Sequence, residues 1–192
     1  MARRSDHSKE ELRDLAIVKA LEIIDKNGVS GFSARAVARA MGYTVGTLYH
    51  VFGDMDNYRL HINARILDDW HEELGAGLKR TKKDPLRYLA QSYIEFARAK
   101  HNRWTALFEF KPDKPAKPPG WYAEKMERLF ALVEKAVLPH SGGDPQKARH
   151  DAKVLWAGIH GICVLSLSGK LDMVGVEKTE TLVDSLLERY IK

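Results

Sequence analysis

The sequence predicts an all-α fold of about nine helices, and two observations support this fold class. Apolar residues recur at the three- and four-residue spacing of a buried helix face along most of the 192 residues. By contrast, no stretch of useful length alternates between apolar and polar residues, as a half-buried strand would. A chain of this length can bury a substantial core and suits one or two domains.

Capping residues and glycines mark the ends of the predicted helices. The pair Asn27-Gly28 ends the first helix, Ser33 caps the second, and Gly42 ends it. Asp54 then caps a long fourth helix. The predicted helices cover approximately residues 12–24, 34–41, 45–51, 55–80, 85–100, 103–110, 121–137, 144–168 and 177–191.

The first three helices are short and close together, which suggests a division of the chain into two parts. We expect residues 1–53 to form an N-terminal three-helix domain and residues 54–192 to form a C-terminal helical bundle. Within the second part, four prolines in residues 111–120 predict an extended loop.

Composition limits the class of protein. The formal net charge of +5 is spread over the chain, so neither part is a basic domain. The single Cys163 excludes a disulfide framework and fits a reducing compartment. No apolar run follows the basic N-terminus, and the longest mostly apolar stretch, Val154 to Leu167, is shorter than the roughly 20 residues that span a bilayer. We therefore expect a cytoplasmic protein without a membrane partner.

The segment "MGYTVGTLYHVF", residues 41–52, differs from the rest of the chain. It holds two glycines, two threonines and two tyrosines, and no Asp or Glu occurs between Lys26 and Gly53. Two short helices joined by a glycine-containing turn form a helix-turn-helix, whose second helix presents its N-terminal end to the major groove of DNA. Thr44 can cap that second helix. An αα-corner without a partner would also need Gly42, but it would not need an acid-free face.

The residues that we expect on double-stranded DNA share short hydroxyls, small size or a positive charge. They are Thr44, Val45, Gly46, Thr47, Tyr49 and His50 on the second helix and its cap, with Arg3, Arg4 and Arg35 as phosphate or minor-groove contacts. Leu48, Val51 and Phe52 should point inward and hold this helix to the first one.

The run "FSARAVARAMGYTVGTLYHVFGDMDNYRLHI" resembles the DNA-binding signature of the tetracycline-repressor (TetR) family of bacterial regulators. Its most specific part is Gly46, Leu48, Tyr49 and Phe52 followed by the cap Asp54. The resemblance implies a homodimer with an N-terminal DNA-binding domain and a C-terminal domain that binds a small inducer and dimerises.

The chain departs from the family pattern at two positions. Met55 stands where the family commonly has a lysine, and Tyr43 replaces a small apolar residue. The C-terminal part resembles the Trp-His-Gly subgroup through Trp156, His160 and Gly161.

Aromatic residues on the C-terminal helices predict a pocket for an apolar or aromatic effector. The candidate ligand-binding residues are Trp70, Tyr93, Phe96, Trp104, Phe108, Trp121, Trp156 and His160. Each of these side chains could instead belong to an ordinary core. For His160, the alternative to a ligand contact is a hydrogen bond to a backbone carbonyl or to a buried tyrosine.

Small and apolar residues on the last two helices predict the dimer interface. The candidates are Ala157, Gly161, Leu182, Val183, Leu186, Leu187 and Tyr190. The helix 144–168 is apolar around most of its second half, so two of its sides must be shielded from water. We expect a second chain to shield one of these sides. The alternative is a larger core within one chain.

Catalytic and cofactor motifs are missing from the sequence. It contains no nucleophile elbow and no phosphate-binding loop, so we expect neither an enzyme nor a cofactor. Asp68, His71 and Glu72 have the spacing of a partial metal site, but such a trio is more often a solvated face.

The sequence therefore favours a ligand-responsive transcriptional repressor. It would bind a near-palindromic operator as a dimer, and a small inducer would release it. The alternatives are a helical small-molecule-binding protein and a constitutive DNA-binding protein without an inducer.

Overall fold

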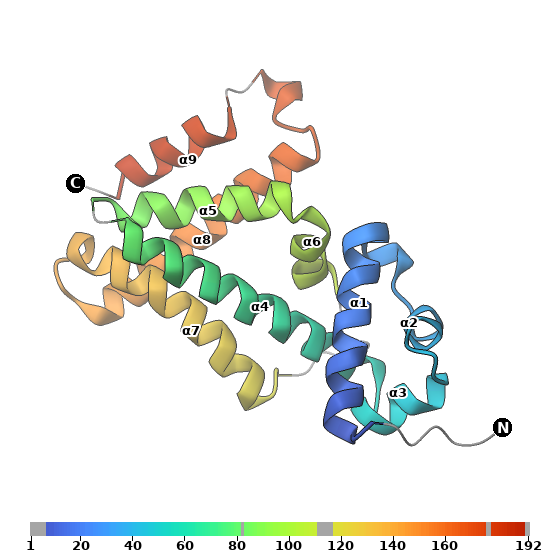
Figure 1. Ribbon diagram of the computed structural model, residues 1–192. Coiled ribbons are helices and arrows are strands. Elements are labelled where there is room, and N and C mark those ends of the chain that lie inside the picture. The colour runs from blue at the N-terminus through green and yellow to red at the C-terminus, as the bar shows by residue number, and fades with distance from the viewer. Residues whose placement is uncertain (1–6, 82, 111–116, 176–177, 191–192) are drawn as a thin grey trace. The chain divides into compact units, whose positions relative to one another are not determined.

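The structure is a computed structural model that describes residues 7–81, 83–110, 117–175 and 178–190. Its described residues form nine α-helices, two short 3₁₀ helices and no strand, which confirms the predicted all-α class (Figure 1). The α-helices are α1 (Lys9–Gly31), α2 (Ala34–Met41), α3 (Val45–Phe52), α4 (Met55–Arg80), α5 (Pro85–Ala99), α6 (His101–Glu109), α7 (Gly120–Val137), α8 (Pro145–Leu167) and α9 (Thr179–Glu188). The 3₁₀ helices are η1 (Leu138–Ser141) and η2 (Asp172–Val174).

The chain forms two compact units that do not follow one another along the sequence. The first unit comprises residues 1–67 and 100–122, and the second comprises residues 68–99 and 123–192. Helix α4 contributes residues to both units. The division of roles between residues 1–53 and 54–192 stays a prediction.

In the first unit, α1 begins with a capping box and ends in a break at a glycine. The Glu11 N–H donates to the Ser8 hydroxyl (3.2 Å), and the Ser8 N–H donates to the Glu11 carboxylate (2.6 Å). Gly28 has φ 69° and ψ −175°, so the regular helix stops at the predicted Asn27-Gly28 pair and a last turn follows.

Helix α6 packs on α1, although the two are far apart in the sequence. The Arg103 guanidinium donates two hydrogen bonds to the Asp25 carboxylate, both of 2.8 Å. The Asn102 amide donates to the Asp25 carbonyl (3.0 Å). These contacts make α6 part of the unit that carries α2 and α3.

The short helix α3 is joined to the start of α4 through a buried aromatic contact. The Phe52 and Tyr58 rings stack with centroids 4.2 Å apart, and the buried Tyr58 hydroxyl donates to the Ala16 carbonyl of α1 (2.7 Å). Burial raises the pKa of Tyr58, so this phenol stays protonated and keeps its hydrogen bond. The predicted cap of α4 is present, because the Asn57 N–H donates to the Asp54 carboxylate (2.7 Å).

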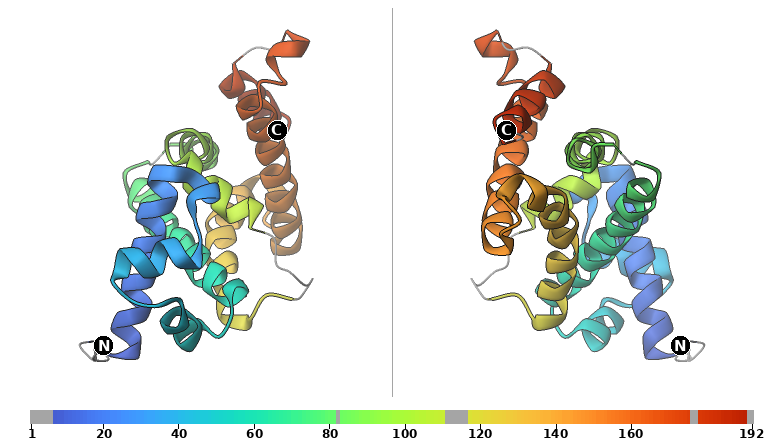
Figure 2. Two further views of the ribbon diagram at one scale, coloured as in Figure 1. Left: turned by 90° about the vertical axis from the view of Figure 1, so that its right-hand side faces the viewer. Right: turned by 90° about the vertical axis from the view of Figure 1, so that its left-hand side faces the viewer.

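In the second unit, helices α5, α8 and α9 pack against one another, and α8 and α9 run side by side (Figure 2). Gly158 allows this close approach, because a Cβ at this position would lie 2.8 Å from Leu186 on α9. Arg87 and Arg98 on α5 form ion pairs with Asp184 and Glu180 on α9. Within the described part of the chain, no helix is long and apolar enough to cross a membrane.

Candidate functional site

The turn between α2 and α3 depends on a glycine in the left-handed region. Gly42 has φ 75° and ψ 26°, and its N–H donates to the Arg39 carbonyl (3.2 Å). The Tyr43 N–H then donates to the Ala38 carbonyl (2.9 Å), which closes the end of α2. A side chain at residue 42 would strain this conformation, so the glycine fixes the angle at which the chain enters α3.

Helix α3 has one buried face and one exposed face. Leu48, Val51 and Phe52 are buried, as the sequence predicts. The predicted DNA-contacting residues lie on the other face: Thr44, Gly46, Tyr49 and His50 are exposed, and Val45 and Thr47 are partly exposed. Arg35 is exposed on α2. Arg3 and Arg4 lie outside the described residues.

No side chain caps the N-terminus of α3 in the described structure. We expected Thr44 to cap this helix with its side chain, and that expectation is wrong: Thr44 is at the N-cap position but makes no side-chain cap hydrogen bond. Its hydroxyl instead lies 3.3 Å from the Thr47 hydroxyl, so the two can share one hydrogen bond and both keep further capacity. Free backbone N–H groups at a helix start attract anions such as phosphate.

A further contact at the same turn could not be read from the sequence. The Nδ1 atom of His7, just before α1, lies 2.7 Å from the Tyr43 hydroxyl. The two rings pack edge to face with centroids 6.0 Å apart. The one sequence signal was the unusual Tyr43, and nothing near it in the chain indicates a partner 36 residues away.

In the second unit, five of the eight predicted effector-binding side chains form one aromatic cluster. Trp70 stacks on Phe96 (4.4 Å between centroids) and contacts Tyr93 (5.5 Å). The Tyr93 hydroxyl is 2.7 Å from His160 Nδ1, and Trp156 packs against His160 (5.6 Å). Phe130 on α7 also belongs to this cluster, because it packs edge to face against Trp156, but it was not among the predicted effector residues.

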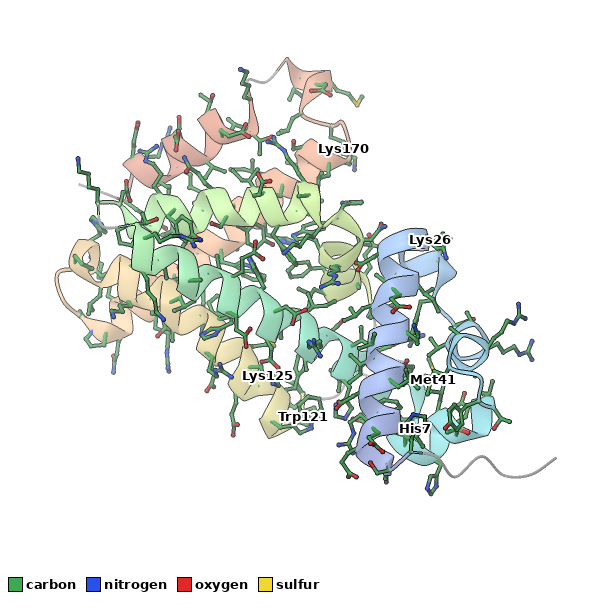
Figure 3. The ribbon with its side chains drawn as sticks, viewed as in Figure 1. His7, Lys26, Met41, Trp121, Lys125 and Lys170 are labelled. Carbon is green, nitrogen blue, oxygen red and sulfur yellow. The ribbon has the colours of Figure 1, made fainter. Side chains whose placement is uncertain are left out.

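The other three predicted effector residues belong to the first unit. Trp104 and Phe108 contact each other on α6 with centroids 5.2 Å apart. Trp121, at the start of α7 and labelled in Figure 3, stacks on His61 of α4 (4.7 Å). A role of either group of aromatic residues in binding a ligand stays a prediction.

The surroundings of His160 favour its neutral form. Burial lowers its pKa, since the protonated ring would lose its hydration. Its partner, Tyr93, is buried. The structure thus shows the alternative of a histidine bonded to a buried tyrosine, and a ligand contact stays a prediction.

The second unit also has a polar cleft of about 720 Å³, separate from the aromatic cluster. Arg98, Ser166, Asp172, Lys178, Thr179 and Glu180 are among the residues that line it. Arg98 pairs with Glu180, and the Ser166 and Thr179 hydroxyls are 2.6 Å apart. Several polar groups of the cleft therefore already have partners within the chain.

The predicted dimer residues divide into buried and accessible ones. Val183 and Leu187 are 1% and 0% exposed in the single chain, so they belong to its own core, and a role in a dimer interface stays a prediction. Leu182, Leu186 and Tyr190 are half-buried, Ala157 is exposed, and a Cβ at Gly161 would meet no atom within 4 Å. The accessible candidates thus lie on both α8 and the C-terminal segment that includes α9, and the more exposed Ala157 is on α8.

The residues considered for metal binding or covalent chemistry have other roles. Asp68 forms an ion pair with Lys125 on α7. Within the described residues, no group of three His, Cys, Asp or Glu side chains could hold a metal ion. Burial raises the pKa of the Cys163 thiol to about 11, so it is a poor nucleophile.

The short helices α2 and α3, joined by the turn at Gly42, form a helix-turn-helix whose second helix has an exposed face without carboxylates. The chain is therefore a helix-turn-helix protein. Residues 86–190 match the family model described as the tetracyclin repressor-like C-terminal domain, and residues 16–57 match that of bacterial regulatory proteins of the tetR family. The chain belongs to the TetR family, as its resemblance predicts. Members of this family are transcriptional regulators rather than enzymes, and they bind DNA and small ligands, typically as dimers.

Individual relatives are distant. An uncharacterized HTH-type transcriptional regulator of Mycobacterium tuberculosis, Rv0681, is 24% identical over 172 residues, which cover 88% of this chain and 76% of that protein. Among solved structures, a protein of unknown function from Rhodococcus sp. RHA1 has a TM-score of 0.73 at 20% identity, with 99% and 97% of the two chains covered. FadR of Bacillus subtilis, solved with stearoyl-CoA, has a TM-score of 0.66 at 16% identity and covers 93% and 97%. These structures share the fold with this chain.

Proposed function

We propose that this regulator is a ligand-responsive repressor that binds a near-palindromic operator as a dimer and is released by a small inducer. The observation that carries the proposal is the exposed face of α3. Hydroxyls, a glycine and a histidine lie on this face, and no carboxylate occurs in the sequence between Lys26 and Gly53. Such a surface suits the phosphates and base edges of DNA.

The N-terminal end of α3 would enter the major groove. Thr44 and Thr47 offer short hydroxyls, and Gly46 allows the backbone to approach the duplex because nothing but Thr44 lies near its missing Cβ. Tyr49, which is 46% exposed, and His50 would reach the sugar-phosphate backbone beside the groove. In a dimer the two α3 helices would sit about 34–36 Å apart or somewhat more, which makes the operator near-palindromic.

An exposed apolar face of α8 supports the dimer. Val154, Val164, Leu165 and Leu167 on this helix are each about two-fifths exposed, and Ala157 and the open Gly161 lie among them. Burying such side chains against a second copy removes apolar surface from water. Because the same surface of each chain would take part, the contact would be two-fold symmetric.

The effector would bind in the second unit, at the aromatic cluster around Trp70, Tyr93 and Trp156. A cluster of this composition suits an apolar or aromatic compound, with the Tyr93–His160 pair available to a polar group. Helix α4 is continuous and takes part in both units, so we expect it to transmit the change. By linkage, the effector and DNA must weaken each other's binding by the same factor.

The test is a binding titration of the purified protein with DNA fragments from upstream of its own gene, at several salt concentrations. We expect tight, sequence-selective and salt-sensitive binding. Tyr49→Phe should weaken it by about fivefold through the loss of one hydrogen bond, without lowering thermal stability. Tyr88→Phe, on α5 in the second unit, removes a hydroxyl elsewhere and is the matched control.

Two other results would contradict the proposal. Weak, sequence-blind binding that no compound weakens would favour a constitutive DNA-binding protein. Ligand binding without any affinity for DNA would favour a helical small-molecule-binding protein. An unchanged affinity of the Tyr49→Phe variant would remove Tyr49 from the DNA contacts.

A further inference from the structure

His7 and Tyr43 lie together at the edge of the proposed DNA-binding face, although neither belongs to the predicted contact set. Tyr43 directly precedes Thr44, the N-cap residue of α3, and His7, labelled in Figure 3, is exposed just before α1. The hydrogen bond between His7 Nδ1 and the Tyr43 hydroxyl (2.7 Å) holds the two rings in one place.

The pair always has at least one hydrogen-bond donor left over, whichever group donates within it. If the Tyr43 hydroxyl donates to Nδ1, the neutral imidazole carries its proton on Nε2. If Nδ1 carries the proton and donates, the tyrosine O–H is left. A phosphate oxygen, which only accepts, matches this remaining donor in both cases.

The local structure restrains the two residues that carry this donor. The Ser8–Glu11 capping box sets the direction of the chain directly after His7, and the Glu11 carboxylate accepts the Ser8 N–H. On the other side, the Tyr43 N–H is bonded to the Ala38 carbonyl at the end of α2. Both rings are thus attached to rigid elements, which lowers the entropic cost of a contact.

We infer that His7 and Tyr43 act as one unit that donates a hydrogen bond to a DNA backbone phosphate beside the N-terminal end of α3. This inference rests on the proposed DNA binding and adds a contact to it. It also explains the replacement of a small apolar residue by Tyr43, because a small residue would leave His7 without its partner.

The test uses the full chain and a mixed-sequence duplex at low salt, since a phosphate contact affects all sequences alike and no operator is needed. Tyr43→Phe and His7→Ala should each weaken binding by about fivefold to tenfold. The double variant should lose no more than either single variant, because each change alone disrupts the unit. His7→Asn should keep most of the affinity, since its amide both accepts and donates.

Two controls separate a contact from a structural effect. His150→Ala removes an exposed histidine from α8 and should leave DNA affinity unchanged. The melting temperatures of the His7 and Tyr43 variants should equal that of the unchanged protein, because the pair lies at the surface.

The outcomes distinguish this inference from the proposed function. If the unchanged protein binds the duplex and both single variants bind equally well, the inference is wrong and the repressor proposal stands. If the losses of the two variants multiply, the rings act separately and the inference is also wrong. If the unchanged protein binds no duplex at all, both proposals fail.

Discussion

His160 shows how a single side chain makes stability depend on pH. Burial among Tyr93, Trp156 and their neighbours lowers its pKa from the ordinary value of 6.5, so the unfolded chain takes up this proton more readily than the folded one. The contribution of His160 to the free energy of unfolding is therefore fully present above pH 6.5 and is lost as the pH is lowered below this value.

We predict that chemical unfolding at pH 8, 6 and 5, values on both sides of the ordinary imidazole pKa, will show this loss of stability on acidification. His160→Gln keeps a hydrogen-bonding group but cannot be protonated, so its stability should fall less over the same range. His150→Gln, at an exposed position on α8, is the control and should follow the unchanged protein. Parallel curves for the His160 variant and the unchanged protein would contradict the assignment.

At the scale of elements, the Asp25 carboxylate of α1 forms an ion pair with Arg103 of α6. Arg103 donates two hydrogen bonds to Asp25, and the exposed fractions of the two side chains are 24% and 45%. We predict that Arg103→Ala will destabilise the packing of α6 by about 1 kcal/mol, because the pair is partly solvated. Compared with the unchanged protein, the variant should show faster hydrogen exchange at the α6 amides, and the increase should be larger in α6 than in α9. Unchanged protection of the α6 amides would show that the remaining contacts, among them the hydrogen bond from Asn102 to the Asp25 carbonyl, are enough to hold the helix.

Local signals made most of the helix ends predictable. Ser33, Gly42 and Asp54 act through backbone atoms within a few residues, and each ends or begins a helix where the sequence indicates. Thr44 is the N-cap residue of α3 as the sequence indicates, but its hydroxyl lies beside that of Thr47, one turn along the helix, and does not accept a backbone hydrogen bond.

Contacts between distant parts of the chain were not predictable. Arg103 and Asp25 are 78 residues apart, so nothing in either segment assigns α6 to the first unit. Apolar spacing likewise shows that α9 has a buried face, but not which chain covers it. Val183 and Leu187 turned out to be covered by their own chain. The contacts of the remaining candidates with DNA, effector and partner stay predictions.

At the scale of the whole molecule, exposed apolar side chains are concentrated in one region. Val154, Val164, Leu165 and Leu167 on α8 are exposed, and Met173 and Val174 in η2 follow. We predict that Val164→Asp will convert dimers into monomers in light scattering, because a carboxylate would be buried without a partner. Val18→Asp on α1 changes a valine of similar exposure, 39% against 41%, and should leave the oligomeric state unchanged. A Val164→Asp dimer would place the interface elsewhere.

The discontinuous first unit has a consequence for the newly made chain. Helices α1, α2 and α3 leave the ribosome first, but α6, which packs on α1, belongs to residues 100–122. The first unit therefore reaches its final packing only after residue 122 has been synthesised. In a nascent chain that stalls before this point, α1, α2 and α3 lack their contacts with α6. A hybrid protein that takes over the complete first unit must contain both segments.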